Sequence, residues 1–278
     1  MADEAPAPPA LRETLKIACF GANSTGKTLN IARLVEGVGA ENVGVISIEH
    51  GLSTIASYLK PEQVFVTTGI QHFREEALAW VARRYAGATK WVCVDGGTRL
   101  LQWNAGRIWG CSDLAYEELV FNGKRRSDLK DFARYGSRFI TSQGEIDGYA
   151  QWKEIAVQAE SIFNAVIKIP CNWYWTFWED LTGGDDRKKT LPWQADAPGK
   201  GSREAIYGTF DFILRMTYLN GRPIATHDPN KHEARTKARD DWHGGVRVKE
   251  VMDDFNLGVF VKSLSAPQQA ASAAGGVK

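Results

Sequence analysis

Short apolar runs alternate with longer stretches of helical spacing through most of the chain. Parallel strands are buried on both faces and therefore read as continuous apolar runs. Such runs lie at residues 15–20, 42–49, 64–67, 90–95 and 172–178. Apolar residues recur every three or four positions, as on one face of a helix, within residues 29–35, 72–86 and 149–169. This alternation predicts an α/β domain with a mainly parallel sheet, flanking helices and right-handed crossovers.

The C-terminal third carries the signal of an antiparallel hairpin. Asn220 and Gly221 separate two strand-like runs at 210–219 and 223–226, and an Asn-Gly pair favours the tight turn that joins antiparallel strands. We therefore expect a hairpin at one edge of the sheet.

Several stretches interrupt this rhythm. Residues 103–148 are rich in glycine, arginine and aromatics and predict an insertion, residues 179–204 predict a polar loop, and residues 233–241 predict a charged, exposed helix. The Pro/Ala-rich ends, 1–12 and 264–278, bury too little to fold alone and predict disordered tails. The expected organisation is a single domain over residues 13–263.

Composition narrows the class of protein. With 44% apolar residues in 278, the chain can fill one large core. It has no run of eighteen apolar residues, so no membrane-spanning helix is expected. The start of the chain lacks the basic and apolar regions of a signal peptide. The net charge of +1 creates no global basic field, so any nucleic-acid binding needs local patches. The chain has four cysteines, Cys19, Cys93, Cys111 and Cys171, and their spacing is not that of metal ligands. We therefore expect reduced thiols in a cytoplasmic protein.

Residues 21–28 carry the clearest chemical signal, because they read G-x-x-x-x-G-K-T between an apolar run and a helical stretch. In such a loop the glycines let successive N–H groups point at phosphate oxygens, and the following helix adds its positive end. Lys27 would reach the β and γ phosphates, and the Thr28 hydroxyl would bind Mg²⁺. The alternative is a chance glycine turn. The predicted nucleotide-binding residues are Gly21, Ala22, Asn23, Ser24, Thr25, Gly26, Lys27, Thr28 and Leu29.

Two acids lie where a phosphate loop would use them. Asp95 ends an apolar run and is predicted to support Mg²⁺ together with Thr28; alternatively it only opens the Gly96-Gly97 turn. Glu49 ends the run that follows the loop helix and could accept a proton from an attacking water, or else cap the next helix. Glu49 and Lys27 are the predicted catalytic residues.

The order of these motifs resembles the RecA-like ATPase core over residues 13–230, and more narrowly the small phage-encoded RecA-like ATPases, some of which act in recombination or single-strand annealing. The resemblance implies a RecA-like P-loop NTPase fold that hydrolyses ATP with Mg²⁺, with Glu49 as the base, in the host cytoplasm if the protein is phage-encoded. It also implies a homo-oligomer, a ring or filament, in which Lys200 and Arg203 reach the neighbouring protomer's ATP. The alternative for both cations is a solvated loop charge. One departure stands out: Glu179 and its neighbours replace the polar pair that senses the γ-phosphate in recombinases.

The two irregular stretches occupy the places of the DNA-contacting loops in the resembled fold, which implies single-stranded DNA as a partner. Cations beside aromatics suit sequence-tolerant single-strand binding. The alternative is a solvated insertion whose aromatics pack on its own domain. The candidate DNA-binding residues are Lys124, Arg125, Arg126, Arg134 and Arg138 in the first stretch and Arg187, Lys188 and Lys189 in the second.

Two other functions stay open. A P-loop small-molecule kinase could use residues 103–148 as an arginine-rich lid, although Glu49 argues against it. A nucleotide-dependent assembly or packaging factor could bind protein through the same insertion. A GTPase is disfavoured, because Glu233 stands where the guanine-specificity motif needs Asp.

Overall fold

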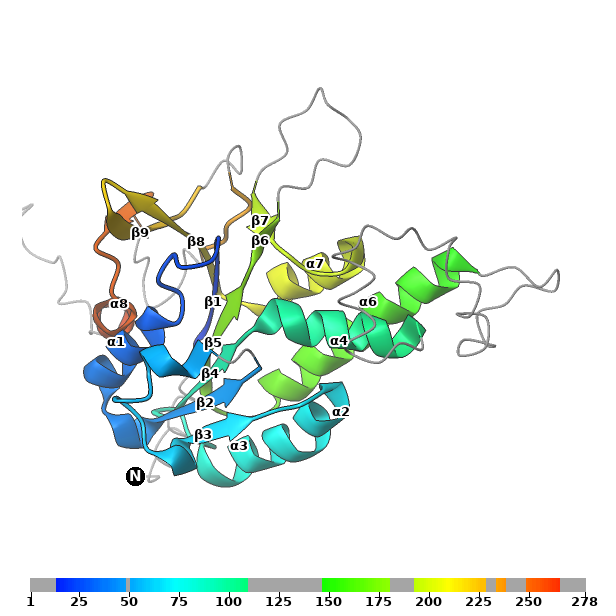
Figure 1. Ribbon diagram of the computed structural model, residues 1–278, viewed down its shortest axis with the longest axis horizontal. Coiled ribbons are helices and arrows are strands. Elements are labelled where there is room, and N and C mark those ends of the chain that lie inside the picture. The colour runs from blue at the N-terminus through cyan, green and yellow to red at the C-terminus, as the bar shows by residue number, and fades with distance from the viewer. Residues whose placement is uncertain are drawn as a thin grey trace, which may run out of the picture.

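The computed structural model describes residues 14–48, 51–109, 147–180, 193–228, 234–238 and 249–265. Within these ranges the chain forms an α/β structure whose centre is a large, mostly parallel sheet with helices on both faces (Figure 1). No helix in the described ranges combines the length and apolar character needed to cross a membrane.

The sheet runs in the order β10-β9-β8-β1-β5-β4-β2-β3. Every neighbouring pair from β8 to β3 is parallel, whereas β9 and β10 are antiparallel and form one edge. The strands are β1 (Lys16–Phe20), β2 (Val43–Ser47), β3 (Val64–Val66), β4 (Trp91–Asp95), β5 (Asn172–Phe177), β8 (Phe212–Leu219), β9 (Arg222–Thr226) and β10 (Val251–Asp253). A separate two-stranded sheet pairs β6 (Glu179–Asp180) with β7 (Gln194–Ala195).

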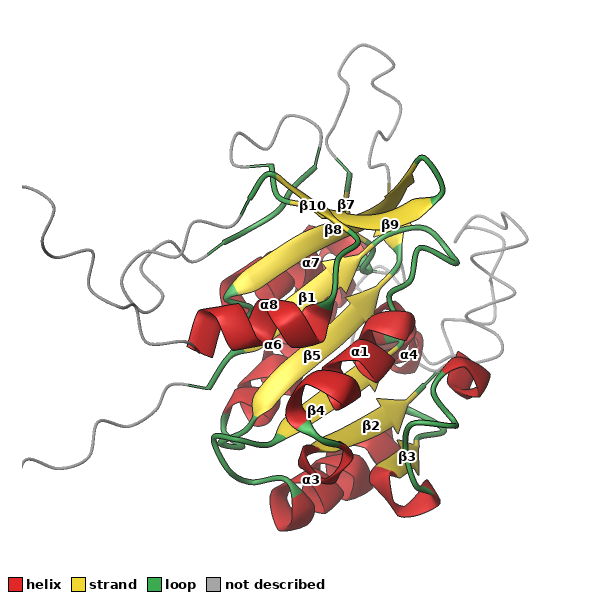
Figure 2. Cartoon of the chain, turned by 90° about the vertical axis from the view of Figure 1, so that its left-hand side faces the viewer, coloured by secondary structure: helices red, strands yellow, loops and turns green. Residues whose placement is uncertain are grey.

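Helices cover the two faces unequally. Figure 2 shows α1 (Leu29–Val38) and α8 (Leu257–Ser265) lying across one face. The other face is covered by α3 (Leu78–Arg84), α4 (Gly97–Trp109), α6 (Gly148–Ile167) and α7 (Gly199–Thr209). Short helical turns at Ala40–Asn42, Gly51–Thr54 and Pro61–Gln63 join elements, and Ile70–His72 (α2) and Phe73–Ala77 lead into α3.

Alternating side chains of the central strands fill both layers. In β5, Trp173, Trp175 and Phe177 face the layer of α6 and α7, while Tyr174 faces the layer of α1. Trp175 is fully buried, and the centre of its ring lies 5.3 Å from that of Phe163 and 5.9 Å from that of Phe210. The aromatic run of β5 is therefore a core strand in the middle of the sheet.

The predicted α/β class, mainly parallel sheet and antiparallel C-terminal hairpin are confirmed. Asn220 and Gly221 both have positive φ, 51° and 77°, as the tight turn between β8 and β9 requires. Cys19, Cys93 and Cys171 are free, buried thiols as expected, and Cys111 lies outside the described residues.

Three boundary predictions are wrong. The insertion does not begin at residue 103, because α4 continues to Trp109 with Ala105 and Ile108 buried. The polar loop is shorter than 179–204, because β6, β7 and the start of α7 lie inside that range. The C-terminal tail does not begin at residue 264, since Leu264 is buried in α8 against the sheet.

The helix predicted at 233–241 is also wrong over its described part. Residues 234–238 are not helical and form two isolated β-bridges, Ala234 with Trp193, which precedes β7, and Lys237 with Ile213 of β8. Thr236 is buried and bonds to the backbone of Asp228, so this segment packs on the domain although its sequence is charged.

Candidate functional site

The candidate site lies where β1 meets α1, and residues 21–28 form the connection. Gly26 has a φ of 86° and Ser24 a φ of 64°, so the backbone reverses direction within the loop. A Cβ at Gly21 would overlap the Met216 carbonyl oxygen, so only glycine lets the loop leave the sheet this closely. The loop is closed onto its helix, because the Asn30 amide donates to the Gly26 carbonyl at 3.0 Å. The predicted strand–loop–helix context is confirmed.

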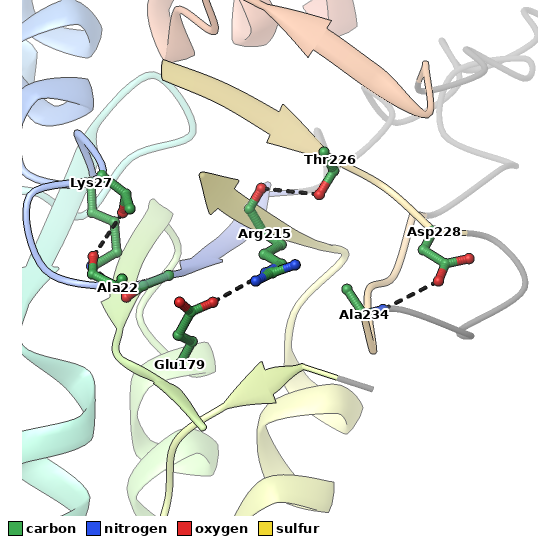
Figure 3. A network of polar contacts seen from close by, with 9 residues as sticks. Ala22, Lys27, Glu179, Arg215, Thr226, Asp228 and Ala234 are labelled. Carbon is green, nitrogen blue, oxygen red and sulfur yellow. Dashed lines mark hydrogen bonds and ion pairs between the residues drawn. The ribbon is translucent and has the colours of Figure 1, made fainter. Parts of the chain in front are cut away.

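Lys27 folds back over the loop. Its ammonium donates to the carbonyl oxygens of Gly21 at 2.7 Å and Ala22 at 2.6 Å (Figure 3). The Tyr174 hydroxyl donates to the Lys27 carbonyl at 3.1 Å and so ties the loop to β5. The Lys27 charge, the only one within residues 21–28, is therefore held against the first two residues of the loop.

Asp95 and Thr28 come together across the site. The Thr28 hydroxyl donates to the Asp95 carboxylate, at 3.1 Å and 3.2 Å to its two oxygens. Asp95 is 4% exposed, and burial raises the pKa of its carboxyl, while hydrogen bonds from Thr176 and Thr28 and the charge of Lys27 oppose that rise. Thr28 starts a helix and Asp95 ends a strand 67 residues later, so the pairing is a product of the fold.

Strand β5 adds a third side chain to this group. Because β5 lies between β1 and β4, its Thr176 hydroxyl reaches Asp95 Oδ1 at 2.9 Å and accepts the Gly96 amide at 3.0 Å. The sequence prediction missed Thr176. A lone threonine in the run Trp-Tyr-Trp-Thr-Phe-Trp was the available signal, since an apolar residue would otherwise be expected there.

Asn30 is a second missed residue, and it attaches the C-terminal helix to the loop. It is 1% exposed; its amide nitrogen donates to Gly26 O at 3.1 Å, and its oxygen accepts the Leu257 amide at 2.9 Å. The side chain therefore satisfies the first amide of α8 and a carbonyl of the loop together. No signal in the local sequence indicates this pairing.

Glu49 lies outside the described residues, so its role as base stays a prediction. The chain approaches it from beside the acid site: Ser47 pairs with Asp95, and the Ile48 amide donates to the Asp95 carbonyl at 3.0 Å. The DNA-binding candidates also lie outside the described residues and stay predictions: Lys124, Arg125, Arg126, Arg134, Arg138, Arg187, Lys188 and Lys189.

Lys200 and Arg203 lie in the first turns of α7, which is helical and not the loop predicted. Lys200 is exposed, whereas Arg203 approaches Asp180 at 3.8 Å and the Ala197 carbonyl at 3.5 Å. Nearby, burial raises the pKa of Asp196 to about 6, with a further contribution from Asp180, while Arg203 opposes the rise. Arg203 thus has partners in its own chain, and a role of either cation in a neighbouring protomer stays a prediction.

The donor set at Thr28 and Asp95 fits Mg²⁺ bound with a nucleotide. Mg²⁺ prefers hard oxygen ligands and usually takes one or two from protein, with phosphate oxygens and water completing its shell. A hydroxyl and a carboxylate beside a phosphate loop provide that share. In the described ranges no cluster of three or more His, Cys, Asp or Glu side chains forms a protein-only metal cage.

No protein-family model matches this chain, and neither does any curated protein sequence. A mostly parallel sheet flanked by helices hosts many unrelated activities, so the fold alone does not indicate function. We therefore infer function from the loop, from Thr28 and Asp95, and from the residues around them.

Proposed function

We propose that this protein is a RecA-like P-loop ATPase that binds ATP with Mg²⁺ and hydrolyses it. The contact between the Thr28 hydroxyl and the Asp95 carboxylate carries the proposal, since it joins the phosphate loop to the predicted metal acid. A chance glycine turn gives no reason for a strand-end carboxylate to be buried against the loop's own threonine.

The chain's residues have distinct tasks in this proposal. The amides of the loop and of the first turn of α1 hold the phosphates, and the Lys27 ammonium exchanges its two carbonyl partners for phosphate oxygens. Thr28 and Asp95 would hold Mg²⁺, which supplies charge neutralisation between the β and γ phosphates. Thr176 fixes the orientation of the Asp95 carboxylate.

Glu49 is the proposed general base, because it follows Ser47 by two residues and Ser47 pairs with Asp95 on the neighbouring strand β4. Glu49→Gln should abolish turnover and leave ATP bound, since the amide keeps the shape and loses the basicity. The measurement is phosphate release alongside nucleotide binding by calorimetry. Turnover at the wild-type rate in Glu49→Gln would make the base assignment wrong.

Single-stranded DNA is the proposed partner, in phage-type recombination, annealing or replication, with the protein acting in the cytoplasm as a homo-oligomer. The support is the sequence of the two cationic stretches, 103–148 and 179–204, and the resemblance given above.

The test of this partner is ATP hydrolysis with and without single-stranded DNA at several salt concentrations. Stimulation that declines steeply with salt is expected, because phosphate contacts release counterions. Unchanged hydrolysis together with no retardation of labelled DNA would remove the DNA role. ATP-dependent phosphorylation of a small molecule would instead indicate the kinase alternative.

A further inference from the structure

An ion pair beside the phosphate loop has no task in the proposed function. Arg215 belongs to β8, and its Cα pairs with that of Phe20, the last residue of β1 before the loop. Neighbouring strands lie about 4.8 Å apart, and the next residue of β8, Met216, places its carbonyl against Gly21. Figure 3 shows the Arg215 side chain extending toward Glu179.

Both charges of this pair are largely withdrawn from solvent. Arg215 Nε lies 3.1 Å from Glu179 Oε2, and the two side chains are 18% and 14% exposed. The guanidinium also stacks on Trp193, whose ring centre is 4.7 Å away. Burying an ion pair is seldom net stabilising compared with apolar side chains of similar size, so stability alone is a weak reason for its presence here.

Glu179 occupies an informative place in the chain. It begins β6 two residues after β5, which passes between the loop strand and Asp95. A carboxylate there repels a phosphate, whereas an arginine binds one through charge-assisted, geometrically matched hydrogen bonds. The pair therefore places a phosphate-binding group at this edge of the site, with the carboxylate as its partner.

We propose that Arg215 senses the terminal phosphate of the bound nucleotide, exchanging the Glu179 carboxylate for a phosphate oxygen. This inference rests on the proposed function and adds to it the means by which ATP is distinguished from ADP. Glu179 is the first residue of β6 and Trp193 directly precedes β7, so the guanidinium contacts both arms of the β6–β7 pair. The exchange therefore changes the contacts of β6 and β7, the two strands that flank residues 181–192.

The first test compares the affinities for ATPγS and ADP, with Mg²⁺, by calorimetry. Arg215→Gln should weaken ATPγS about tenfold or more, the worth of a hydrogen bond to a charged group, and change ADP less than about twofold. Arg222→Gln is the matched control: it removes an exposed arginine paired with Asp254, the residue that follows β10, and should leave both affinities unchanged.

The double variant Glu179→Gln/Arg215→Gln separates sensing from simple charge neutralisation. If Arg215 binds the phosphate, the double variant stays deficient for ATPγS, because the cation is still absent. If Arg215 only cancels the negative charge of Glu179, removing both charges restores the affinity for ATPγS, and the proposal is overturned.

A second readout works on the unaltered site. ATPγS should change the tryptophan emission of the wild-type protein and ADP should not, and Trp193→Phe should remove that difference, since Trp193 loses its guanidinium neighbour. If nucleotide leaves the Trp193 contribution to the tryptophan emission unchanged, the exchange does not occur. This readout uses the wild-type Arg215, so it remains valid even if Arg215→Gln fails to fold.

Failure of the inference is distinguishable from failure of the proposed function. If the wild-type protein binds neither nucleotide, both are wrong. If it binds both and Lys27→Ala abolishes binding, but Arg215→Gln weakens ATPγS and ADP equally or not at all, only the sensing role is wrong.

Discussion

Asp196→Asn is expected to stabilise the protein at neutral pH and much less at acid pH. Asp196 lies between β7 and α7, where burial, and then the charge of Asp180, raise the pKa of its carboxyl from 3.8 to about 6. A carboxyl whose pKa is higher in the folded state favours folding when protonated. The protonated Asp196 carboxyl therefore stabilises the folded state relative to the ionised one. This stabilisation is fully present below about pH 4 and is lost as the pH rises through about 6.

The magnitude follows from the shift. The difference between about 6 and 3.8 is about two pKa units, which corresponds to about 3 kcal/mol at pH 7.5. The side chain keeps some contact with solvent, so we take about 2 kcal/mol as the expected gain. For a domain of this size that is a rise in Tm of about 4–8 °C.

Urea unfolding at pH 4.5 and pH 7.5 measures the effect. Asp196→Asn should raise the free energy of unfolding at pH 7.5 and have a much smaller effect at pH 4.5. Asp253→Asn, which changes an exposed carboxyl on β10, is the control and should be neutral at both values. An equal effect of Asp196→Asn at the two pH values, or a loss of stability at pH 7.5, would refute the reasoning.

Two further substitutions test the site and its support. Asp95→Asn should raise the free energy of unfolding, because burial raises the pKa of that carboxyl, and should also abolish Mg²⁺-dependent ATP binding; lower stability would contradict this. Gly258→Ala should destabilise by about 1–3 kcal/mol, because the new Cβ overlaps the Arg33 carbonyl and meets Gly37 at 3.0 Å. Gly208→Ala, with no atom within 4 Å of its Cβ, should be neutral or slightly stabilising in the same melts.

The sequence was sufficient where the signal is local. The strand–loop–helix context of residues 21–28, the parallel strands and the β8–β9 turn each depend on a few consecutive residues, and all were predicted. The mainly parallel character of the sheet was predicted from the same runs, because strands buried on both faces are continuously apolar.

The rest depends on contacts between distant segments. Thr176 became part of the site because β5 lies between β1 and β4, and strand order is not written in any single strand. Arg215 meets Glu179 across 36 residues for the same reason. Likewise α8 is held by Asn30 and by packing on α1, so its start at Leu257 could not be placed from its own sequence.

The most direct test of the central claim is titration calorimetry of ATP with Mg²⁺ into the wild-type protein and Lys27→Ala. The Lys27 ammonium donates to the loop carbonyls of Gly21 and Ala22. Equal melting temperatures of the two proteins would show that the variant is folded. We predict one site per chain for the wild-type protein, with a Kd between about 1 μM and 1 mM, and a loss of at least about tenfold in Lys27→Ala. Absence of binding to the wild-type protein, or equal binding to both, would contradict the account.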